Sequence, residues 1–455
     1  MLLALVLFYG VARFIVVFTD SRLTGDREPY IQLLSQDAVT IRWLTDDEQL
    51  GVVRYGEVKD HLTRIELDED TSNDHSVRLT GLKPGRLYYY QVGNSSSFQP
   101  FQPENHWFRT FPADDEDVDS DDADSATRIW VIGDSGQEGE ILYQVRDQAF
   151  NWMRANPLKK VIADDGPEPL FDIWLALGDI AYRSGTNEQF QSALFEPFSE
   201  VLSSIPLLPV YGNHDDRRWT YFRIFDLPEK AEAGGVASGT ENYYAVDYAN
   251  VHFVVLDSQG SDRDIDGEMV RWLEKDLAQN TRPWVIVAFH HPPYTRGSHD
   301  SDDEGDSDGR MNEMRENVLP VLEKAGVDLV LSGHSHMYER SYMIDCAYGD
   351  SKAFSGKNIV SSGVNQQHTD YIKPLNINSH QGTVYAVAGS SSKVDLGPMD
   401  HPAHHRGFLE AGSMVLDVVA NKLTARFINN NGQVTDTFSI EKKADFESGY
   451  EGCEQ

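Results

Sequence analysis

Short apolar runs recur through the middle of this 455-residue chain, and nearly every one leads into a side chain that can bind a metal. The runs are rich in branched and aromatic residues, end near a glycine and alternate with helical patterns. This combination is typical of buried strands in an α/β sheet. We predict such strands at 129–132, 173–177, 207–210, 284–289 and 327–331.

Further patterns extend this α/β region toward the C-terminus. The run at 251–256 predicts another strand, and the periodicity of 267–279 and 313–324 predicts helices with one apolar side. Later apolar runs predict strands of a second sheet at 383–388, 414–419 and 423–428.

A different pattern occupies residues 28–112. Apolar and polar residues alternate over 39–43 in the two-residue period of a half-buried strand. The segment 82–88 has the Leu-x-Pro-x-x-x-Tyr spacing of a tyrosine corner, in which a phenol ties a strand to the preceding connection of a β-sandwich. These features resemble a fibronectin type III module, and we expect a structural role for Tyr88.

Five short blocks supply the metal-binding side chains in chain order: Gly-Asp-Ser-Gly at 133–136, Gly-Asp-Ile-Ala-Tyr at 178–182, Gly-Asn-His-Asp at 212–215, Val-Ala-Phe-His at 287–290 and Gly-His-Ser-His at 333–336. Together they carry more ligands than one tetrahedral ion takes, and the mixture of carboxylate, phenol, amide and imidazole suits a pair of hard or borderline cations. The candidate metal ligands are Asp134, Asp179, Tyr182, Asn213, His290, His334 and His336.

In each block, the metal-binding side chains follow a predicted strand. Open α/β sheets place their sites at the carboxyl ends of strands, so we expect these side chains to meet at one rim. The glycines let the chain turn sharply while its backbone passes close to the ions. Any one block alone is more often a turn, whereas the ordered set of five is specific.

The five blocks resemble those of the purple acid phosphatases, a family within the calcineurin-like metallophosphoesterases, and the resemblance extends over residues 28–440. It implies an α/β fold class in which an all-β, fibronectin type III-like sandwich precedes a β-sheet sandwich flanked by helices. It also implies that Asp179 bridges two ions. The first ion is then held by Asp134, Asp179, Tyr182 and His336, and the second by Asp179, Asn213, His290 and His334.

The same resemblance implies the metals and the reaction. The family's first ion is ferric iron, which a phenolate such as that of Tyr182 stabilises with a purple colour, and its second is a divalent iron, zinc or manganese. Two cations about 3.5–4 Å apart lower the pKa of a bound water and neutralise charge on a phosphoryl oxygen. We therefore expect a metal-bound hydroxide to attack the phosphorus of a phosphate ester.

The leaving oxygen needs a proton donor, and a histidine within hydrogen-bond reach is the usual one. His214 follows the candidate ligand Asn213, and Asp215 beside it is placed to orient the imidazole or raise its pKa. His291 and His299 are the alternatives. His299 falls near a second active-site histidine of the family, while His291 is as well explained as a neighbour that points away from the metals.

Length and composition predict two folded domains, because 455 residues exceed what one hydrophobic core usually supports and 40% of the residues are apolar. We predict an apolar segment at 1–19, a fibronectin type III-like domain at 28–112, an acidic linker at 113–127, a catalytic domain at 128–440 and a C-terminal tail at 441–455.

The chain is strongly acidic, with 39 basic against 73 acidic residues and a formal net charge of −34. A field of this sign repels nucleic acid and anionic membrane surfaces, so we expect no nucleic-acid partner. The small phosphorylated substrate that we expect is implied by the family resemblance. The oligomeric state stays open.

Two segments concentrate this charge. The dense like charge of the segment 114–124 predicts a solvated linker or loop. Calcium binding is the alternative, although the segment lacks the glycine and terminal glutamate of an EF-hand loop. The segment 300–308 follows the His290 block and leaves the expected metal rim, which makes it a candidate lid or substrate-selecting loop. A surface insertion without such a role explains it equally well.

The first nineteen residues are almost wholly apolar, with Arg13 as the charged exception. An export signal and a membrane anchor both fit, although the basic start and the small-residue cleavage site of an ordinary signal are missing. A strand or helix packed on the protein is the less favoured alternative. Cys346 and Cys453, the only two cysteines, are able to form one disulfide that ties the tail to the loop after the His336 block. Both features favour an extracytoplasmic enzyme, secreted, periplasmic or anchored facing outward.

The sequence therefore predicts a dinuclear metal hydrolase of phosphate monoesters. A phosphodiesterase or nucleotide pyrophosphatase on the same scaffold is the alternative within enzymes, because the motifs do not determine the pocket for a second ester group. A non-catalytic metal-binding surface protein is the alternative outside enzymes, and the complete ligand set speaks against it.

Overall fold

The computed structural model describes residues 23–113, 126–158, 166–216, 218–363, 369–375, 379–446, 449–450 and 453. The apolar segment predicted at 1–19 and most of the acidic linker lie outside these residues. None of the helices in the described part of the chain combines the length and apolar composition needed to cross a bilayer.

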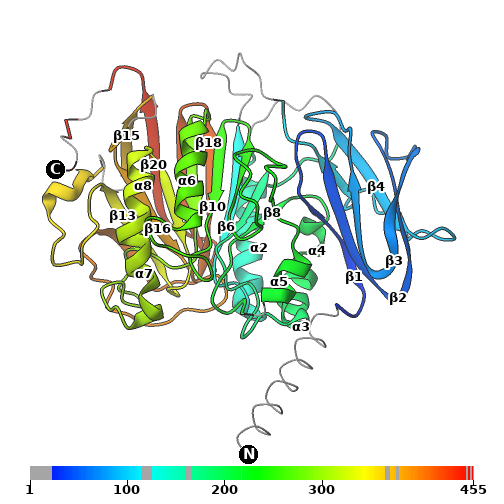
Figure 1. Cartoon of the computed structure of the whole chain (residues 1–455), viewed down its shortest axis with the longest axis horizontal. Helices are drawn as coiled ribbons and strands as arrows, with labels where there is room; N and C mark the ends of the chain where they lie inside the picture. The colour runs from blue at the N-terminus through cyan, green and yellow to red at the C-terminus, as the bar shows by residue number, and fades with distance from the viewer. Residues whose placement is uncertain are drawn as a thin grey trace, which may run out of the picture.

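Five strands build an N-terminal β unit, drawn in blue at one end of the long axis in Figure 1. They are β1 (Arg27–Gln32), β2 (Val39–Gly56), β3 (Arg64–Leu79), β4 (Leu87–Gly93) and β5 (Trp107–Arg109). The long β2 pairs with β1 over its first part and with β4 over its last part, and β3 runs beside both parts. The all-β N-terminal domain that we predicted is confirmed.

The tyrosine corner predicted at 82–88 is also confirmed. The Tyr88 side chain is fully buried, and the Lys83 backbone N–H donates to its phenol oxygen at 3.1 Å. This bond ties the start of β4 to the connection that precedes it.

Alternation along β2 correctly predicted a strand but not a solvated face, because Arg42 is only 5% exposed. Its guanidinium pairs with Asp74 at 2.8 Å and with Asp226 of the following α/β unit at 3.0 Å. Tyr30 and Tyr90 likewise donate their hydroxyls to the carbonyls of Ile224 and Ser203 in that unit. The polar face of the strand is buried against a neighbouring domain, which periodicity within one strand does not reveal.

The α/β unit contains two sheets. The seven-stranded sheet has the order β15-β20-β19-β18-β6-β7-β8. Its strands are β6 (Thr127–Ile132), β7 (Ile173–Ala176), β8 (Leu207–Pro209), β15 (Thr369–Pro374), β18 (Gly412–Val419), β19 (Lys422–Asn429) and β20 (Val434–Lys443). Strands β6, β7 and β8 are parallel, so their carboxyl ends lie at the same edge.

The eight-stranded sheet has the order β14-β13-β16-β12-β11-β10-β9, with β17 paired to β13. Its strands are β9 (Tyr244–Tyr248), β10 (Val251–Val255), β11 (Trp284–Ala288), β12 (Leu329–Ser332), β13 (Tyr338–Ile344), β14 (Ile359–Ser361), β16 (Thr383–Ala388) and β17 (His404–Phe408). Strands β10, β11, β12 and β16 are parallel.

Helices cover the outer faces of the two sheets. On the seven-stranded sheet lies α2 (Glu140–Ala155), whose Phe150 packs on Trp130 of β6. On the other sheet α6 (Glu268–Gln279) and α8 (Leu319–Lys324) share a core with β10, β11 and β12, and both helices stand in front of that sheet in Figure 1. The fold class predicted from the sequence, a β-sheet sandwich flanked by helices, is confirmed.

Shorter helices fill the connections at the strand ends. They are α3 (Asn187–Phe190), η2 (Gln191–Phe195), α4 (Glu196–Leu202), α5 (Arg218–Ile224), η3 (Asp306–Gly309), α7 (Arg310–Glu313), η4 (Met314–Val318) and η5 (Gly356–Asn358). The helix predicted at 313–324 is the continuous run of α7, η4 and α8.

The expectation of one later second sheet was wrong in its grouping. Strand β16 lies beside β12 in the eight-stranded sheet, whereas β18 and β19 extend the sheet that begins with β6. The sequence of an apolar run that is buried on both faces does not indicate which sheet it joins. Its strand pairing depends on the long connections between strands.

Buried in β10, His252 is 1% exposed and connects the eight-stranded sheet to α6. Its ring nitrogens lie 2.6 Å from Asp247 and 2.8 Å from Asp276. Burial alone lowers the pKa of His252, but hydrogen bonds to the two carboxylates outweigh it and raise the pKa to about 9.

This histidine predicts a pH-dependent stability. The folded pKa lies above the ordinary 6.5, so the contribution of His252 is fully present below pH 6.5 and is lost as the pH rises through 9. We expect that loss to be on the order of 3 kcal/mol of unfolding free energy. Urea unfolding at several pH values should show this fall in unfolding free energy in the native chain. The control His61→Asn, which replaces an exposed histidine, should show the same fall. An equally steep fall in His252→Asn would contradict the assignment.

Candidate metal centre

The predicted ligands follow strands from both sheets. Asp134, Asp179 and Asn213 come after β6, β7 and β8 of the seven-stranded sheet, while His290 and His334 come after β11 and β12 of the eight-stranded sheet. The His334 N–H donates to the Asp134 carboxylate at 2.8 Å across the two sheets. The carboxyl ends of both sets of parallel strands therefore meet at one rim.

Tight turns after the strands aim these side chains. Asp134, Asp179 and His334 adopt positive φ angles of 54°, 51° and 67°, a strained conformation that recurs at functional sites. Gly212 is required for space, since a Cβ there would collide with the backbone and carboxylate of Asp179. At Gly178, with φ 87°, a Cβ would lie 2.6 Å from the His290 ring.

One group of predicted ligands surrounds the Tyr182 hydroxyl. This oxygen lies 3.1 Å from a carboxylate oxygen of Asp134, 3.1 Å from one of Asp179 and 3.2 Å from His336 Nε2. His336 Nε2 is in turn 3.4 Å from Asp134. Donor atoms from four side chains thus converge on one small volume.

A second group shares Asp179 with the first. His290 Nε2 lies 2.9 Å from Asn213 Oδ1 and 3.4 Å from Asp179 Oδ1. The His334 ring stands beside His290, with ring centroids 5.0 Å apart. Asp134, Asp179 and His290 also offer one ligand atom each within 4.8 Å of one another. All seven predicted side chains are brought together, with Asp179 between the two groups.

The electrostatics of the rim call for cations. Asp134 and Asp179 are 0% and 1% exposed, and burying two carboxylates so close together is costly unless positive charge compensates them. Burial, Asp134 and Asp179 together raise the pKa of Tyr182 well above its ordinary value. Tyr182 becomes a phenolate here only beside a strong positive charge. Carboxylate, phenol, amide and imidazole donors around a shared carboxylate fit two metal ions.

Neighbouring groups orient the imidazoles. His290 Nδ1 lies 2.7 Å from the Leu177 carbonyl, and His336 Nδ1 lies 2.6 Å from Asp395. Each contact directs the Nε2 of its ring toward the carboxylates. Asp395 was missed by sequence reasoning, because it stands in a loop far downstream with no motif around it.

Asp215 does not orient His214 as expected. Its buried carboxylate accepts backbone N–H groups from Ile180 and Ala181 at 2.9 and 3.2 Å and from Gly212 at 3.0 Å. His214 instead places Nδ1 2.9 Å from the Arg183 carbonyl, and its ring stands edge-on to Tyr182. Adjacent positions in a tight turn point apart, so Asp215 joins two ligand loops while His214 faces the site.

The two alternative histidines differ in exposure. His291 is 1% exposed and its Nδ1 lies 2.9 Å from Ser258 Oγ, so it is packed behind the site. The side chain of His299 is 28% exposed, stacks on His334 with ring centroids 3.8 Å apart, and pairs with Asp306 at 2.9 Å. Only His299 of these two stands at the rim.

The acidic segment 300–308 reaches the centre through η3. Ser307 Oγ lies 2.7 Å from His334 Nε2, and Asp306 holds both His299 and the Asp300 N–H. The expected proximity of this loop to the metal rim is therefore found. Ser307 itself was not predicted, because its only signal is membership of that loop.

Two parts of the chain match known protein families. The family model described as calcineurin-like phosphoesterase matches residues 127–338, and the one described as purple acid phosphatase, N-terminal domain, matches residues 28–110. Purple acid phosphatases 15 and 22 of Arabidopsis thaliana are 26% and 27% identical over 67% and 72% of this chain. The matched parts span 62% and 69% of those two relatives, so the chain covers about two thirds of their length.

A solved structure shares the fold. The purple acid phosphatase PPD1 from seeds of yellow lupin (Lupinus luteus) superposes with a TM-score of 0.65 at 17% identity, covering 95% of this chain and 77% of that one. At this identity the likeness concerns the arrangement of strands and helices.

The shared position of Asp179 predicts that its removal disturbs both groups of ligands. We expect Asp179→Asn to lower the bound metal from roughly two equivalents to fewer than one, because a neutral amide replaces the carboxylate between two cations. Elemental analysis of desalted protein measures this. The control is Asp216→Asn, at an exposed aspartate next to Asp215, and it should keep its full metal content. Unchanged metal in Asp179→Asn would exclude it as a ligand.

Proposed function

We propose that this chain, which belongs to the purple acid phosphatase family of calcineurin-like metallophosphoesterases, hydrolyses small phosphate monoesters. The observation that carries the proposal is the convergence of two carboxylates and one imidazole on the Tyr182 hydroxyl, beside a second group that shares Asp179. Members of the family use two metal ions, and the donor set fits two. The donors come from loops of two sheets, so the fold itself positions them.

We assign the ions by donor type. The phenol-containing group of Asp134, Asp179, Tyr182 and His336 suits a ferric ion, because a hard trivalent cation favours phenolate and carboxylate oxygen. The group of Asp179, Asn213, His290 and His334 suits divalent iron, zinc or manganese. When bound, the pair lowers the pKa of a water and neutralises charge on a phosphoryl oxygen.

We assign proton donation and phosphoryl binding to the histidines at the rim. His214 holds its Nδ1 at the Arg183 carbonyl, which fixes Nδ1 as the protonated donor and directs Nε2 away from the backbone. We assign His214 as the group that hands a proton to the leaving oxygen. We assign His299, which is oriented by Asp306, as a second group that binds the phosphoryl group.

The disulfide between Cys346 and Cys453 supports an extracytoplasmic location. Disulfides form and persist in oxidising compartments and are rare in the cytosol. The pairing expected from cysteine number is present in the structure.

The ferric assignment predicts colour. Purified protein should absorb visible light through charge transfer from Tyr182 to the first ion, and Tyr182→Phe should lose the band because it lacks the phenol oxygen. Absorption spectra at equal metal content measure this. The control Tyr143→Phe, at a hydroxyl that contacts Glu138 on the surface, should keep the band. A colourless protein that is fully metallated and active would refute the ferric assignment.

Substrate preference tests the function itself. We expect higher kcat/KM for aryl and alkyl phosphate monoesters than for diesters with the same leaving groups. Steady-state rates on such a matched panel measure the preference. Faster turnover of the diesters would instead identify a phosphodiesterase.

The same panel tests the proton donor. His214→Ala should reduce kcat by about 10²–10⁴-fold for poor leaving groups and much less for good ones, because only poor leaving groups need the proton. The exposed His61→Ala serves as the control. Equal losses across the panel would argue against His214 in this role.

A further inference from the structure

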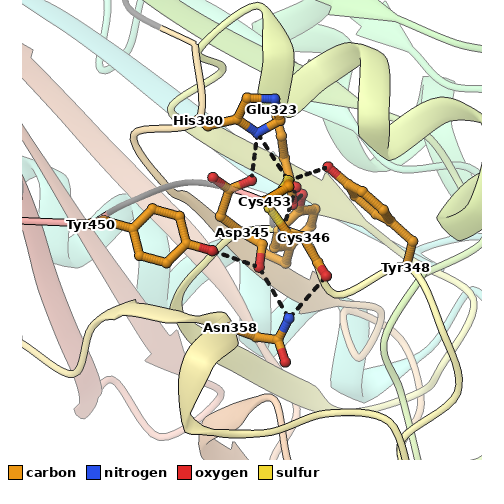
Figure 2. The surroundings of a disulfide bond; sticks show 9 residues. Glu323, Asp345, Cys346, Tyr348, Asn358, His380, Tyr450 and Cys453 are labelled. Carbon is orange, nitrogen blue, oxygen red and sulfur yellow. Dashed lines mark hydrogen bonds and ion pairs between the residues drawn. A yellow bond between two sulfur atoms is a disulfide. The ribbon is translucent and has the colours of Figure 1, made fainter. Parts of the chain in front are cut away.

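A second cluster of ligand side chains lies at the far end of β13 from the metal rim (Figure 2). Asp345 and Cys346 directly follow β13, His380 stands in the turn before β16, and Cys453 comes from the C-terminal tail. Each offers one ligand atom, and these four atoms all lie within 4.8 Å of one another. Because β13 spans about 23 Å, the cluster is separate from the centre that contains His336.

The four side chains already contact one another. Cys346 and Cys453 form a disulfide across 107 residues of sequence, with Cα atoms 5.5 Å apart. His380 Nδ1 lies 3.0 Å from Asp345 Oδ1 and 3.5 Å from Cys453 Sγ. Figure 2 shows the imidazole directed at both the carboxylate and the sulfur. One ring nitrogen therefore faces the point around which all the donors are gathered.

Glu323 of α8 holds the backbone of this cluster in place. Its carboxyl group accepts the Cys346 N–H at 2.8 Å and the Tyr385 hydroxyl at 2.6 Å, and its backbone carbonyl accepts the His380 N–H at 2.9 Å. Burial and the neighbouring Asp345 raise the pKa of Glu323 well above its ordinary value. Glu323 thus connects α8 to both segments that carry Cys346 and His380.

Asn358 completes the support from the other side. Its amide donates to the backbone carbonyls of Asp345 at 3.3 Å and Cys346 at 2.9 Å. The segments that carry Asp345, Cys346 and His380 are therefore held by contacts that do not involve the disulfide.

We propose that Asp345, Cys346, His380 and Cys453 form a redox-controlled zinc site. In the oxidised chain the disulfide joins the tail to the loop after β13. In the reduced chain one Zn²⁺, bound by the two thiolates, His380 and Asp345, makes the same connection. The tail is then tethered in both oxidising and reducing surroundings.

The exchange balances with a dithiol as reductant. The dithiol gives two electrons and two protons to the Cys346–Cys453 bond, which breaks to two thiols, while the dithiol itself becomes a disulfide. Binding of Zn²⁺ then releases the two thiol protons to solvent, because thiolates are the ligands. Cys346, His380 and Cys453 are each partly exposed, so a small dithiol and the ion have access.

The two thiolates of this cluster favour zinc, and the seven ligands proposed at the rim include no sulfur. Two thiolates, an imidazole and a carboxylate form a tetrahedral site with Zn–S distances of about 2.3 Å and Zn–N of about 2.0–2.1 Å. Those lengths place the two sulfurs roughly 3.8 Å apart, so the sulfurs separate once their bond is broken. His380 Nδ1, at 3.0 Å from Asp345 and 3.5 Å from Cys453, already lies at about the spacing of ligands around one ion.

Thiol chemistry tests the proposal without using phosphatase activity, since the chain has only two cysteines and both belong to the cluster. The full-length protein is reduced with dithiothreitol, desalted, and treated with a thiol-specific reagent with and without Zn²⁺. We expect Zn²⁺ to slow modification of both thiols by at least about tenfold. Co²⁺ in place of Zn²⁺ should give the near-ultraviolet absorption of cobalt–thiolate bonds, which a rim of oxygen and nitrogen donors does not give.

A histidine variant separates metal binding from mere proximity of thiols. His380→Ala leaves both thiols in place and should weaken Zn²⁺ binding by about 10- to 100-fold. His61→Ala, at an exposed histidine of the β unit, should bind Zn²⁺ as the native chain does.

Two results would overturn the proposal. One is equal thiol reactivity with and without Zn²⁺ in reduced protein that keeps its native circular dichroism. The other is a reduced chain that unfolds and does not refold when Zn²⁺ is added, since the ion would then fail to replace the disulfide. A loss of phosphatase activity alone would concern the metal centre at the rim. It would not affect the measurements of thiol reactivity and of refolding with Zn²⁺.

Discussion

The bond from the His334 N–H to the Asp134 carboxylate joins the rims of two separate sheets, and the metal centre depends on it. Each sheet alone supplies part of the donor set. Asp134, Asp179 and Asn213 belong to one sheet, and His290 and His334 belong to the other. Docking of the sheets must therefore be accurate, and a dense core of branched and aromatic side chains between them provides the rigidity.

Asp215 performs a related task within one sheet. By accepting N–H groups from the turn after β7 and from Gly212 after β8, it fixes two ligand loops against each other. Both oxygens of Asp215 are occupied by backbone N–H groups, whereas Asp134 and Asp179 beside it each present an oxygen to the Tyr182 hydroxyl. Three buried acids lie together at this rim, and the difference in their partners decides which of them are available to metals.

The strands and the predicted ligands could be recognised from the sequence because each depends on local pattern. An apolar run followed by glycine and a metal-binding side chain predicted the turns at Asp134, Asp179 and Asn213. Partners that arrive from distant loops could not be predicted. Asp395 meets His336 only after the chain has passed through β14, β15 and β16, and Ser307 meets His334 through an acidic loop whose composition resembles any solvated insertion.

The directions in which side chains point within a tight turn could not be predicted from the sequence either. The pairing of Asp215 with His214 was inferred from adjacency, yet neighbouring residues in a tight turn diverge. In the same way, the burial of Arg42 in β2 depends on Asp226, which lies in another domain. Sequence pattern identifies which residues stand near a site, whereas their partners follow from tertiary packing.

Strand β13 connects two donor clusters of opposite character. His336 precedes it among carboxylate, phenol and imidazole donors, and Asp345 and Cys346 follow it beside a second cysteine. The rim offers oxygen and nitrogen donors that suit iron, manganese or zinc, while a pair of thiolates favours zinc, so the two ends of one strand differ in the ions they prefer. The sulfur cluster is masked as a disulfide whenever the surroundings are oxidising. The two cysteine sulfurs that bind zinc in the reduced chain are therefore joined to each other in the extracytoplasmic compartment that we propose. There they do not compete with the metal centre for ions.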